Sequence, residues 1–309
     1  AAMKILFMGT PDFAVPCLDI LVSNGFDVCG AVTQPDKPKG RGHKFTPPPV
    51  KEYAISKNIP VYQPQTLKDG EFEKVLDELK PQLIAVVAYG KILPEYILDF
   101  PEYGCVNVHG SVLPKYRGAA PIQWAIINGD KTTGVTAQYM KMGVDTGDII
   151  FTDETEILPD ETYGELYTRL SQSGAKLLLK TVNAIKDGTA PRTEQDESEA
   201  THAPMLTKET GHIDWTKSAD EVLSLIRGTN PWPMSYAMYG DEMMKVFGVK
   251  KGSGFDAPPG KIRIVNKKLE ISCGKDSVVV DEIQFKGGKR MTVASYLNGH
   301  DIDENIILK

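Results

Sequence analysis

The chain has 309 residues, enough for two domains of ordinary size, and its 41% hydrophobic and 25% charged residues are typical of a globular protein. A net charge of −6 disfavours binding nucleic acid over the whole surface, but salt screens charges beyond about 8 Å, so a local basic patch can still bind it. The first apolar run, Ile5–Met8, is too short for a membrane span or a secretory signal, so we expect a cytoplasmic protein with no membrane partner.

Residues 1–188 alternate short apolar runs with helical patterns. The apolar runs predict five strands, at Ile5–Met8, Val28–Thr33, Leu83–Ala88, Cys105–His109 and Val135–Met140. The helical patterns end at Leu21 or cover Phe72–Leu79, Ala119–Ile127 and Tyr163–Ile185. Continuous apolar strands separated by helices predict an α/β domain with a Rossmann-like, doubly wound parallel sheet. Ligands of such sheets bind beyond the carboxyl ends of the strands.

The character of the sequence changes after residue 188. Residues 189–206, with the acidic run Glu194–Glu199, predict an exposed linker. In residues 207–309, a helix at Ser218–Arg227 precedes short β-type runs separated by turns rich in Gly, Lys and Asp. These runs are Met244–Val249, Gly260–Val265, Leu269–Ser272, Ser277–Val280 and Ile283–Phe285. Their spacing predicts a small antiparallel β-barrel, similar to an OB-fold.

Two polar side chains share one face of the predicted strand Cys105–His109. Because side chains alternate along a strand, Asn107 and His109 point to one face and the two intervening valines to the other. An amide and an imidazole would then lie together at the carboxyl end of this strand. Alternatively, both are polar groups that the following loop satisfies, and the spacing alone leaves this open.

A candidate carboxylate, Asp145, lies in the segment Met142–Asp148. That segment follows the predicted strand Val135–Met140, which a single helix separates from Cys105–His109. We therefore expect the two strands to be neighbours and Asp145 to lie over the same edge as the amide and the imidazole. The alternative is a turn-capping aspartate before a glycine.

The segment from His109 to Ile122 reads His-Gly-Ser-Val-Leu-Pro-Lys-Tyr-Arg-Gly-Ala-Ala-Pro-Ile and closely resembles the signature of the folate-dependent formyltransferases. Val112 replaces a more usual leucine. The resemblance implies that the catalytic residues are Asn107, His109 and Asp145. It implies that the tetrahydrofolate site is lined by Ser111, Val112, Leu113 and Pro114. It also implies that two loops cradle the pteridine ring, largely through their backbone groups: Val87, Ala88, Tyr89 and Gly90 in one, and Gly143, Val144 and Asp145 in the other.

These residue types suit formyl transfer from N10 of 10-formyltetrahydrofolate to an amine, which passes through a tetrahedral oxyanion. An amide donor such as Asn107 stabilises the oxyanion, and losing one such donor typically costs about 10²–10³ in rate. A histidine titrates near neutrality and can exchange protons with the reacting nitrogens, and Asp145 would orient it. The chemistry needs no metal, and the five histidines and four cysteines lack zinc-site spacing.

The acceptor is indicated by a second segment, Thr33–Lys44, with the sequence Thr-Gln-Pro-Asp-Lys-Pro-Lys-Gly-Arg-Gly-His-Lys. It resembles the insertion by which the family members that act on methionyl-tRNA hold the acceptor end of the initiator tRNA. Its basic residues are Lys37, Lys39, Arg41 and Lys44. Arg41 is the preferred contact, because a guanidinium group binds phosphates and stacks on unpaired bases. Phe13 could lie near the methionyl side chain, with core packing as the alternative.

The resemblance extends into the second predicted domain through Ile213–Trp215 and Arg227–Pro233. Residues 240–309 contain ten Lys and two Arg against six Asp and four Glu, so a slightly basic barrel could contact tRNA phosphates. The candidates are Lys245, Lys250, Lys251, Lys261, Lys289 and Arg290, each of which could instead be an ordinary solvated side chain.

The expected function is therefore formylation of initiator methionyl-tRNA for translation initiation. We expect a monomer of bacterial type without an obligate protein partner. Two alternatives stay open. A sibling enzyme that also uses 10-formyltetrahydrofolate could act on a sugar nucleotide or a small amine, and it would give the basic segment no role. A non-catalytic RNA-binding protein on the same scaffold would lack transfer activity altogether.

Overall fold

The computed structural model describes residues 2–39, 42 and 44–309, which form two compact units. One unit comprises Ala1–Pro121, Thr132–Glu156 and Tyr167–Ala203, and the other comprises Ile122–Lys131, Ile157–Leu166 and Pro204–Lys309. This division differs from the predicted boundaries at residues 188 and 206. Two short segments of the N-terminal sequence belong to the second unit, and most of the predicted linker belongs to the first.

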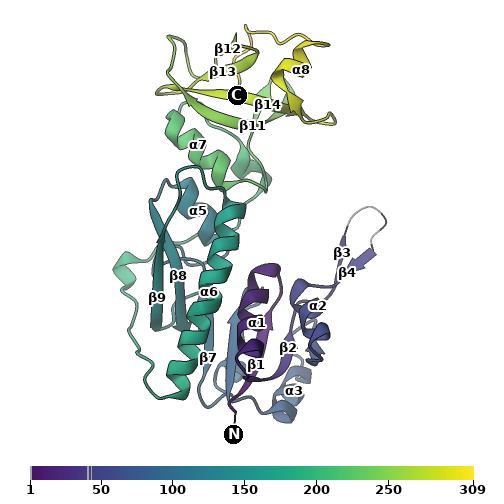
Figure 1. The fold of residues 1–309 in the computed structure, drawn as a ribbon, viewed down its shortest axis with the longest axis vertical. Helices are drawn as coiled ribbons and strands as arrows, with labels where there is room; N and C mark the ends of the chain where they lie inside the picture. Colours follow the sequence, from purple (N-terminus) through teal and green to yellow (C-terminus); the bar gives the residue numbers. More distant parts are fainter. Residues whose placement is uncertain (1, 40–41, 43) are drawn as a thin grey trace. The chain divides into compact units, whose positions relative to one another are not determined.

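A seven-stranded sheet forms the centre of the first unit (Figure 1). Its strand order is β5-β2-β1-β6-β7-β8-β9, and a separate hairpin pairs β3 with β4. The strands are β1 Lys4–Gly9, β2 Asp27–Val32, β3 Lys37–Lys39, β4 Lys44–Thr46, β5 Val61–Tyr62, β6 Leu83–Val87, β7 Cys105–His109, β8 Thr132–Tyr139 and β9 Ile149–Glu156. All five strands predicted for this part of the chain are present. β9 was not predicted, because its polar half, Thr-Asp-Glu-Thr-Glu, hides the strand pattern.

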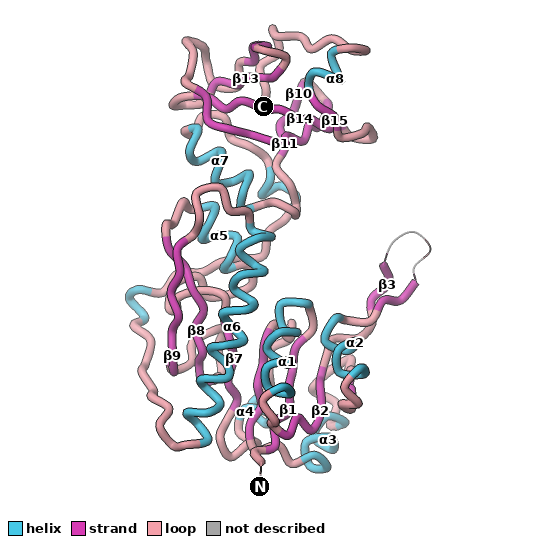
Figure 2. Tube along the Cα trace, in the orientation of Figure 1, coloured by secondary structure: helices cyan, strands magenta, loops and turns pink. Residues whose placement is uncertain are grey.

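Helices cover both faces of this sheet (Figure 2). They are α1 Val15–Ser23, α2 Pro49–Ser56, α3 Glu71–Leu79, α4 Glu95–Leu98 and the long α6 Tyr163–Lys186, with short 3-10 turns at Asp12–Ala14 and Glu197–Glu199. On one face, Leu6 of β1 belongs to a buried cluster with Phe72 of α3 and Ile97 of α4. On the other face α6 approaches closely at Gly174, where an added Cβ would lie 3.1 Å from the Val108 side chain. The prediction of a doubly wound α/β domain is thus confirmed.

The direction of one strand differs from the prediction. β8 is indeed the neighbour of β7, but it runs antiparallel to it, and β9 runs antiparallel to β8. A parallel neighbour needs a crossover that packs a helix back on the sheet. Here the connection contains α5, Pro121–Ile127, most of which belongs to the other compact unit. The sheet is therefore mixed, with β7 at the junction between its parallel and antiparallel parts.

The second unit contains an antiparallel sheet in the order β10-β11-β14-β13-β12, and β15 pairs with β14. Its strands are β10 Tyr236–Tyr239, β11 Glu242–Gly252, β12 Ile262–Val265, β13 Lys268–Ser272, β14 Ser277–Phe285 and β15 Met291–Thr292, and its helices include α7 Ala219–Gly228, α8 Val293–Leu297 and a 3-10 turn at Lys208–Gly211. Ser218 and Glu221 form a capping box that starts α7. The two runs predicted at residues 277–285 form one strand, β14.

The last residues of the chain connect the two outer strands of this sheet. Met238 of β10 exchanges two backbone hydrogen bonds with Lys309, and the Leu308 N–H donates to the Gly260 carbonyl just before β12. Gly260 has φ +88°, and a Cβ there would lie 2.4 Å from the Leu308 carbonyl oxygen, so only glycine fits this approach. The C-terminal residues thereby continue the predicted barrel between its two edges.

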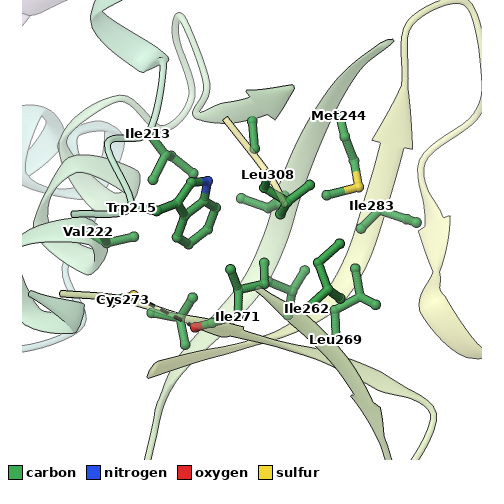
Figure 3. Close-up of a cluster of buried hydrophobic side chains, with 14 of the residues drawn as sticks. Ile213, Trp215, Val222, Met244, Ile262, Leu269, Ile271, Cys273, Ile283 and Leu308 are labelled. Carbon is green, nitrogen blue, oxygen red and sulfur yellow. Dashed lines mark hydrogen bonds between the residues drawn. The ribbon is translucent and has the colours of Figure 1, made fainter. Parts of the chain in front are cut away.

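Buried side chains from α7, the strands and the C-terminal residues form one core in this unit (Figure 3). Ile271 of β13 is fully buried there, with Trp215 in the same cluster.

We expect Ile271→Ala to lower the free energy of unfolding of this unit by about 2–5 kcal/mol, because it removes apolar contacts and leaves a cavity. Denaturant titration followed by tryptophan fluorescence measures this. Val265→Ala, at an exposed position on the adjacent β12, should stay within about 0.5 kcal/mol of the wild type.

Candidate functional site

The imidazole of His109 lies between a backbone carbonyl and a carboxylate. Its Nε2 atom is 2.8 Å from the Tyr116 carbonyl oxygen, and its Nδ1 atom is 3.6 Å from Oδ2 of Asp145. A carbonyl oxygen only accepts hydrogen bonds, so Nε2 carries a hydrogen in this arrangement. His109 is 7% exposed, which limits access of water to the ring. The structure thus brings together two of the three predicted catalytic residues.

Asn107 reaches the same carboxylate through a glutamine that the sequence analysis did not single out. Nε2 of Gln138 donates to Oδ1 of Asn107 at 3.0 Å and to Oδ1 of Asp145 at 3.1 Å. Nδ2 of Asn107 donates to the Val86 carbonyl at 2.9 Å, which leaves its second hydrogen for another acceptor. Gln138 lies directly opposite Asn107 in the β7–β8 ladder, so both side chains face the same side of the sheet.

Backbone groups of the segment that follows β7 hold His109 and Asp145. Gly118 N–H donates to Oδ2 of Asp145 at 2.9 Å, and the Tyr116 carbonyl contacts His109. Tyr116 has φ 59° and Asp145 has φ 54°. Such left-handed conformations are costly for residues other than glycine, and they cluster at functional sites.

The predicted folate-site residues differ in exposure. The side chains of Val87, Tyr89, Ser111 and Leu113 are buried. Ser111 Oγ donates to the Lys115 carbonyl, so this hydroxyl is already engaged within its own loop. Ala88, Gly90, Gly143 and Val144 are exposed, and Val112 and Pro114 are partly exposed. The accessible residues of the two predicted loops therefore include two glycines, one alanine and the exposed side chain of Val144.

Part of the predicted exposed linker is in fact buried against this site. Gln195 is 9% exposed, and its Nε2 donates to the carbonyl oxygens of Asp145 and Gly147. Arg117, 3% exposed, binds Gln195 and Glu197. The prediction of exposure was wrong for Gln195. It relied on the acidic composition of the segment, whereas the burial comes from contacts with residues about 50 to 80 positions away.

The basic segment lies only partly within the described residues. Arg41 lies outside them, whereas Lys37 of β3 and Lys44 of β4 are exposed and Lys39 is the last residue of β3. The start of the segment is anchored, because Asp36 binds Nζ of Lys51 at 3.0 Å and Nε2 of Gln63 at 2.7 Å. These contacts lower the pKa of Asp36.

Phe13, the residue predicted near the methionyl side chain, is 7% exposed. Its ring centroid lies 5.1 Å from that of Tyr167. The Phe13 backbone N–H also donates to the Tyr167 hydroxyl. These contacts favour the alternative of a packing role.

One cysteine lies on the same strand as two of the candidate catalytic residues. Cys105, the first residue of β7, is buried, and desolvation raises the pKa of its thiol to about 12, so it forms little reactive thiolate near neutrality. Across the described part of the chain, no three His, Cys, Asp or Glu side chains are grouped to hold a metal ion.

None of the described helices is both long and apolar enough to cross a membrane.

Comparison with protein families finds two matches. Residues 3–182 match the formyl transferase family, and residues 205–301 match the formyl transferase C-terminal domain. Curated relatives named methionyl-tRNA formyltransferase include one from Acetivibrio thermocellus, 51% identical over 309 residues, and one from Alkaliphilus oremlandii, 50% identical over 308 residues. In both comparisons the alignment covers 99% of this chain and 99% of the relative.

Solved structures share the fold at lower identity. An N-formyltransferase from Helicobacter canadensis, in complex with folinic acid and dTDP-3-aminofucose, superposes with a TM-score of 0.69 at 19% identity, covering 90% of this chain and 98% of that one. HypX from Aquifex aeolicus, in complex with tetrahydrofolic acid, has a TM-score of 0.63 at 16% identity, covering 98% of this chain and 49% of that one. At these low identities, both comparisons show only that the proteins share a fold with this chain.

Proposed function

The chain belongs to the formyl transferase family, and from this membership we propose that it transfers the formyl group of 10-formyltetrahydrofolate to the amino group of initiator methionyl-tRNA. Relatives of about 50% identity that align over their full length carry that activity in their names, which favours this acceptor over a sugar nucleotide. The structures of sibling formyltransferases are far more distant in sequence.

The observation that carries the proposal is the grouping of Asn107, His109 and Asp145 through Gln138 and Gly118. We assign the remaining N–H of Asn107 to the formyl oxygen, where negative charge develops during transfer. The hydrogen on Nε2 of His109 is available to a substrate atom that replaces the Tyr116 carbonyl as its partner. Asp145 lies beside Nδ1 on the other side of the imidazole and orients the ring.

The transfer balances without an external reactant. The amino nitrogen of methionine forms a bond to the formyl carbon, and the bond between that carbon and N10 of the folate breaks. The amine loses one proton and N10 gains one. We assign the movement of this proton to His109, with Asp145 as its partner.

We propose that backbone groups of two loops hold the folate. A pteridine ring carries several nitrogen and oxygen atoms in one plane, and exposed backbone groups can pair with such an edge. Ala88, Gly90, Gly143 and Val144 offer these groups in two loops. The positive φ angles of Ala88, 51°, Gly90, 99°, and Gly143, 106°, turn successive peptide groups in directions that regular strands do not allow.

The deciding experiment compares acceptors. The protein is incubated with 10-formyltetrahydrofolate and either initiator or elongator methionyl-tRNA, with a dTDP-amino sugar as a third acceptor. Formylation of the initiator in preference to the other two supports the proposal. Preference for the amino sugar would identify a sibling activity, and no transfer to any amine would favour a non-catalytic RNA-binding protein.

For the tRNA contact we propose Arg41 together with Lys37, Lys39 and Lys44. Arg41→Ala is expected to lower kcat/KM for methionyl-tRNA by roughly ten- to a hundredfold, because one charged contact is worth about 1–3 kcal/mol. The same change should reduce the slope of log affinity against log salt concentration by about 1. Filter binding at several salt concentrations and steady-state kinetics measure these two effects.

The matched control for Arg41→Ala is Lys74→Ala. Lys74 is an exposed cation on α3, away from the basic segment, and pairs with Glu71. It should leave the salt slope and kcat/KM unchanged. Folate affinity should be the same in both variants. Equal losses in the two variants would show that only the total charge matters and would remove the role assigned to Arg41.

A further inference from the structure

Gln195 spans the turn that carries Asp145. Its Nε2 atom donates to the Asp145 carbonyl at 2.8 Å and to the Gly147 carbonyl at 2.7 Å, so both amide hydrogens hold this turn. The side chain comes from the segment between α6 and the second unit and reaches across about 50 positions of sequence. Gln195 itself is 9% exposed, so water competes little for these bonds.

The oxygen of the same amide is held by Arg117. Oε1 of Gln195 accepts from Nε of Arg117 at 3.1 Å and from Nη2 at 2.9 Å. Carbonyl oxygens only accept and a guanidinium group only donates, so the network allows a single orientation of the amide. Glu197 binds the far edge of Arg117 with two bonds of 2.8 Å and helps to raise the pKa of Arg117.

Arg117 stands between the two backbone groups that hold the candidate catalytic residues. The carbonyl of Tyr116, the residue before it, contacts His109, and the N–H of Gly118, the residue after it, donates to Asp145. Gln195 therefore connects Arg117 and its two neighbours to the turn formed by Asp145 and Gly147. The turn needs such a connection, because φ 54° at Asp145 is unfavourable unless its surroundings hold it.

We propose that Gln195 is a positioning residue for formyl transfer, which holds Asp145 against His109 through two hydrogen bonds to the turn and one link to Arg117. It contacts no reacting atom, and its effect passes through the placement of the carboxylate. This inference rests on the proposed function, because it assigns Gln195 a role in that reaction.

Two variants test this role. Gln195→Ala removes both donors and the acceptor. Gln195→Glu keeps the size and the bonds from Arg117, but its carboxylate has no hydrogen to give to the two carbonyls near neutral pH. Both variants are expected to lower kcat by roughly ten- to a hundredfold, since small displacements of a catalytic group have effects of that size. KM for methionyl-tRNA should stay within about threefold, whereas KM for folate should rise, because Gln195 holds the turn that includes the proposed folate residues Gly143 and Val144.

A loss of stability alone must be separated from a loss of positioning. Leu178→Ala removes a fully buried side chain of α6, the helix that covers the face of the sheet opposite to the side chains of Asn107 and His109. It should lower the melting temperature and leave kcat unchanged below that temperature. Wild-type kcat in Gln195→Glu would overturn the proposal, since the link to Arg117 would then suffice without the two carbonyl bonds.

A structural readout keeps the inference testable apart from the reaction. Amide hydrogen exchange over residues 143–148 should be faster in Gln195→Ala and Gln195→Glu than in the wild type, and unchanged in Leu178→Ala. If the wild type formylates methionyl-tRNA and the Gln195 variants do so equally well, the inference fails and the proposed function stands. If the wild type transfers to no acceptor, the proposed function fails. In that case, unchanged exchange in the Gln195 variants overturns the inference as well.

Discussion

His109→Ala is expected to lower kcat for formyl transfer by about 10²–10⁴-fold, the usual worth of general acid–base catalysis. The variant loses the only imidazole that lies beside Asp145 among the described residues. Folate binding should be retained, because His109 is not part of the two loops proposed to hold the pteridine ring. Single-turnover kinetics with saturating substrates measures the chemical step directly.

A matched variant separates proton transfer from packing. His109→Gln keeps a polar side chain that can donate to the Tyr116 carbonyl, but it does not titrate near neutrality. It should preserve the fold and lose as much kcat as the alanine variant. Full activity in His109→Gln would mean that only a hydrogen bond is needed at this position, and proton transfer would have to be assigned elsewhere.

Asn107→Ala is expected to lower kcat by about 10²–10³-fold, because it removes the N–H assigned to the developing oxyanion. Asn107→Asp should be at least as severe. The aspartate places negative charge next to the formyl oxygen, and it replaces the donor to the Val86 carbonyl by an acceptor.

The same kinetic assay with each variant tests the assignment of Asn107. The expected order of rates is wild type, then Asn107→Ala, then Asn107→Asp at or below it. A variant with aspartate that kept wild-type kcat would contradict a role for Asn107 as donor. Folate affinity measured by titration serves as the control, and it should change little in either variant.

Strand periodicity was sufficient to place two residues of the site. The alternation of Val106, Asn107, Val108 and His109 predicts which side chains share a face, and the structure has Val108 against α6 on the opposite face of the sheet. The same argument would have found Gln138. It is a polar residue at an alternate position of a strand that is otherwise buried, and it lies opposite Asn107.

Other features of the fold and the site could not be predicted from local sequence patterns. The apolar run of β8 predicts a strand but not its direction, and the structure pairs it antiparallel to β7. Gln195 lies in an acidic run that by composition belongs on the surface, and only its partners at Asp145 and Arg117 account for its burial. Asp145 was predicted mainly by resemblance to a family, and neither its left-handed φ nor its contact with Gln195 is visible in the local sequence pattern.

The connection of Lys309 to Met238 and of Leu308 to Gly260 also bears on how the chain folds. The first pair is separated by some seventy residues, and closing so long a loop costs chain entropy before any contact compensates for it. Contacts of this kind slow folding and tend to form after the local hairpins. We therefore expect the barrel to close late, so that substitutions at Leu308 accelerate unfolding more than they slow folding.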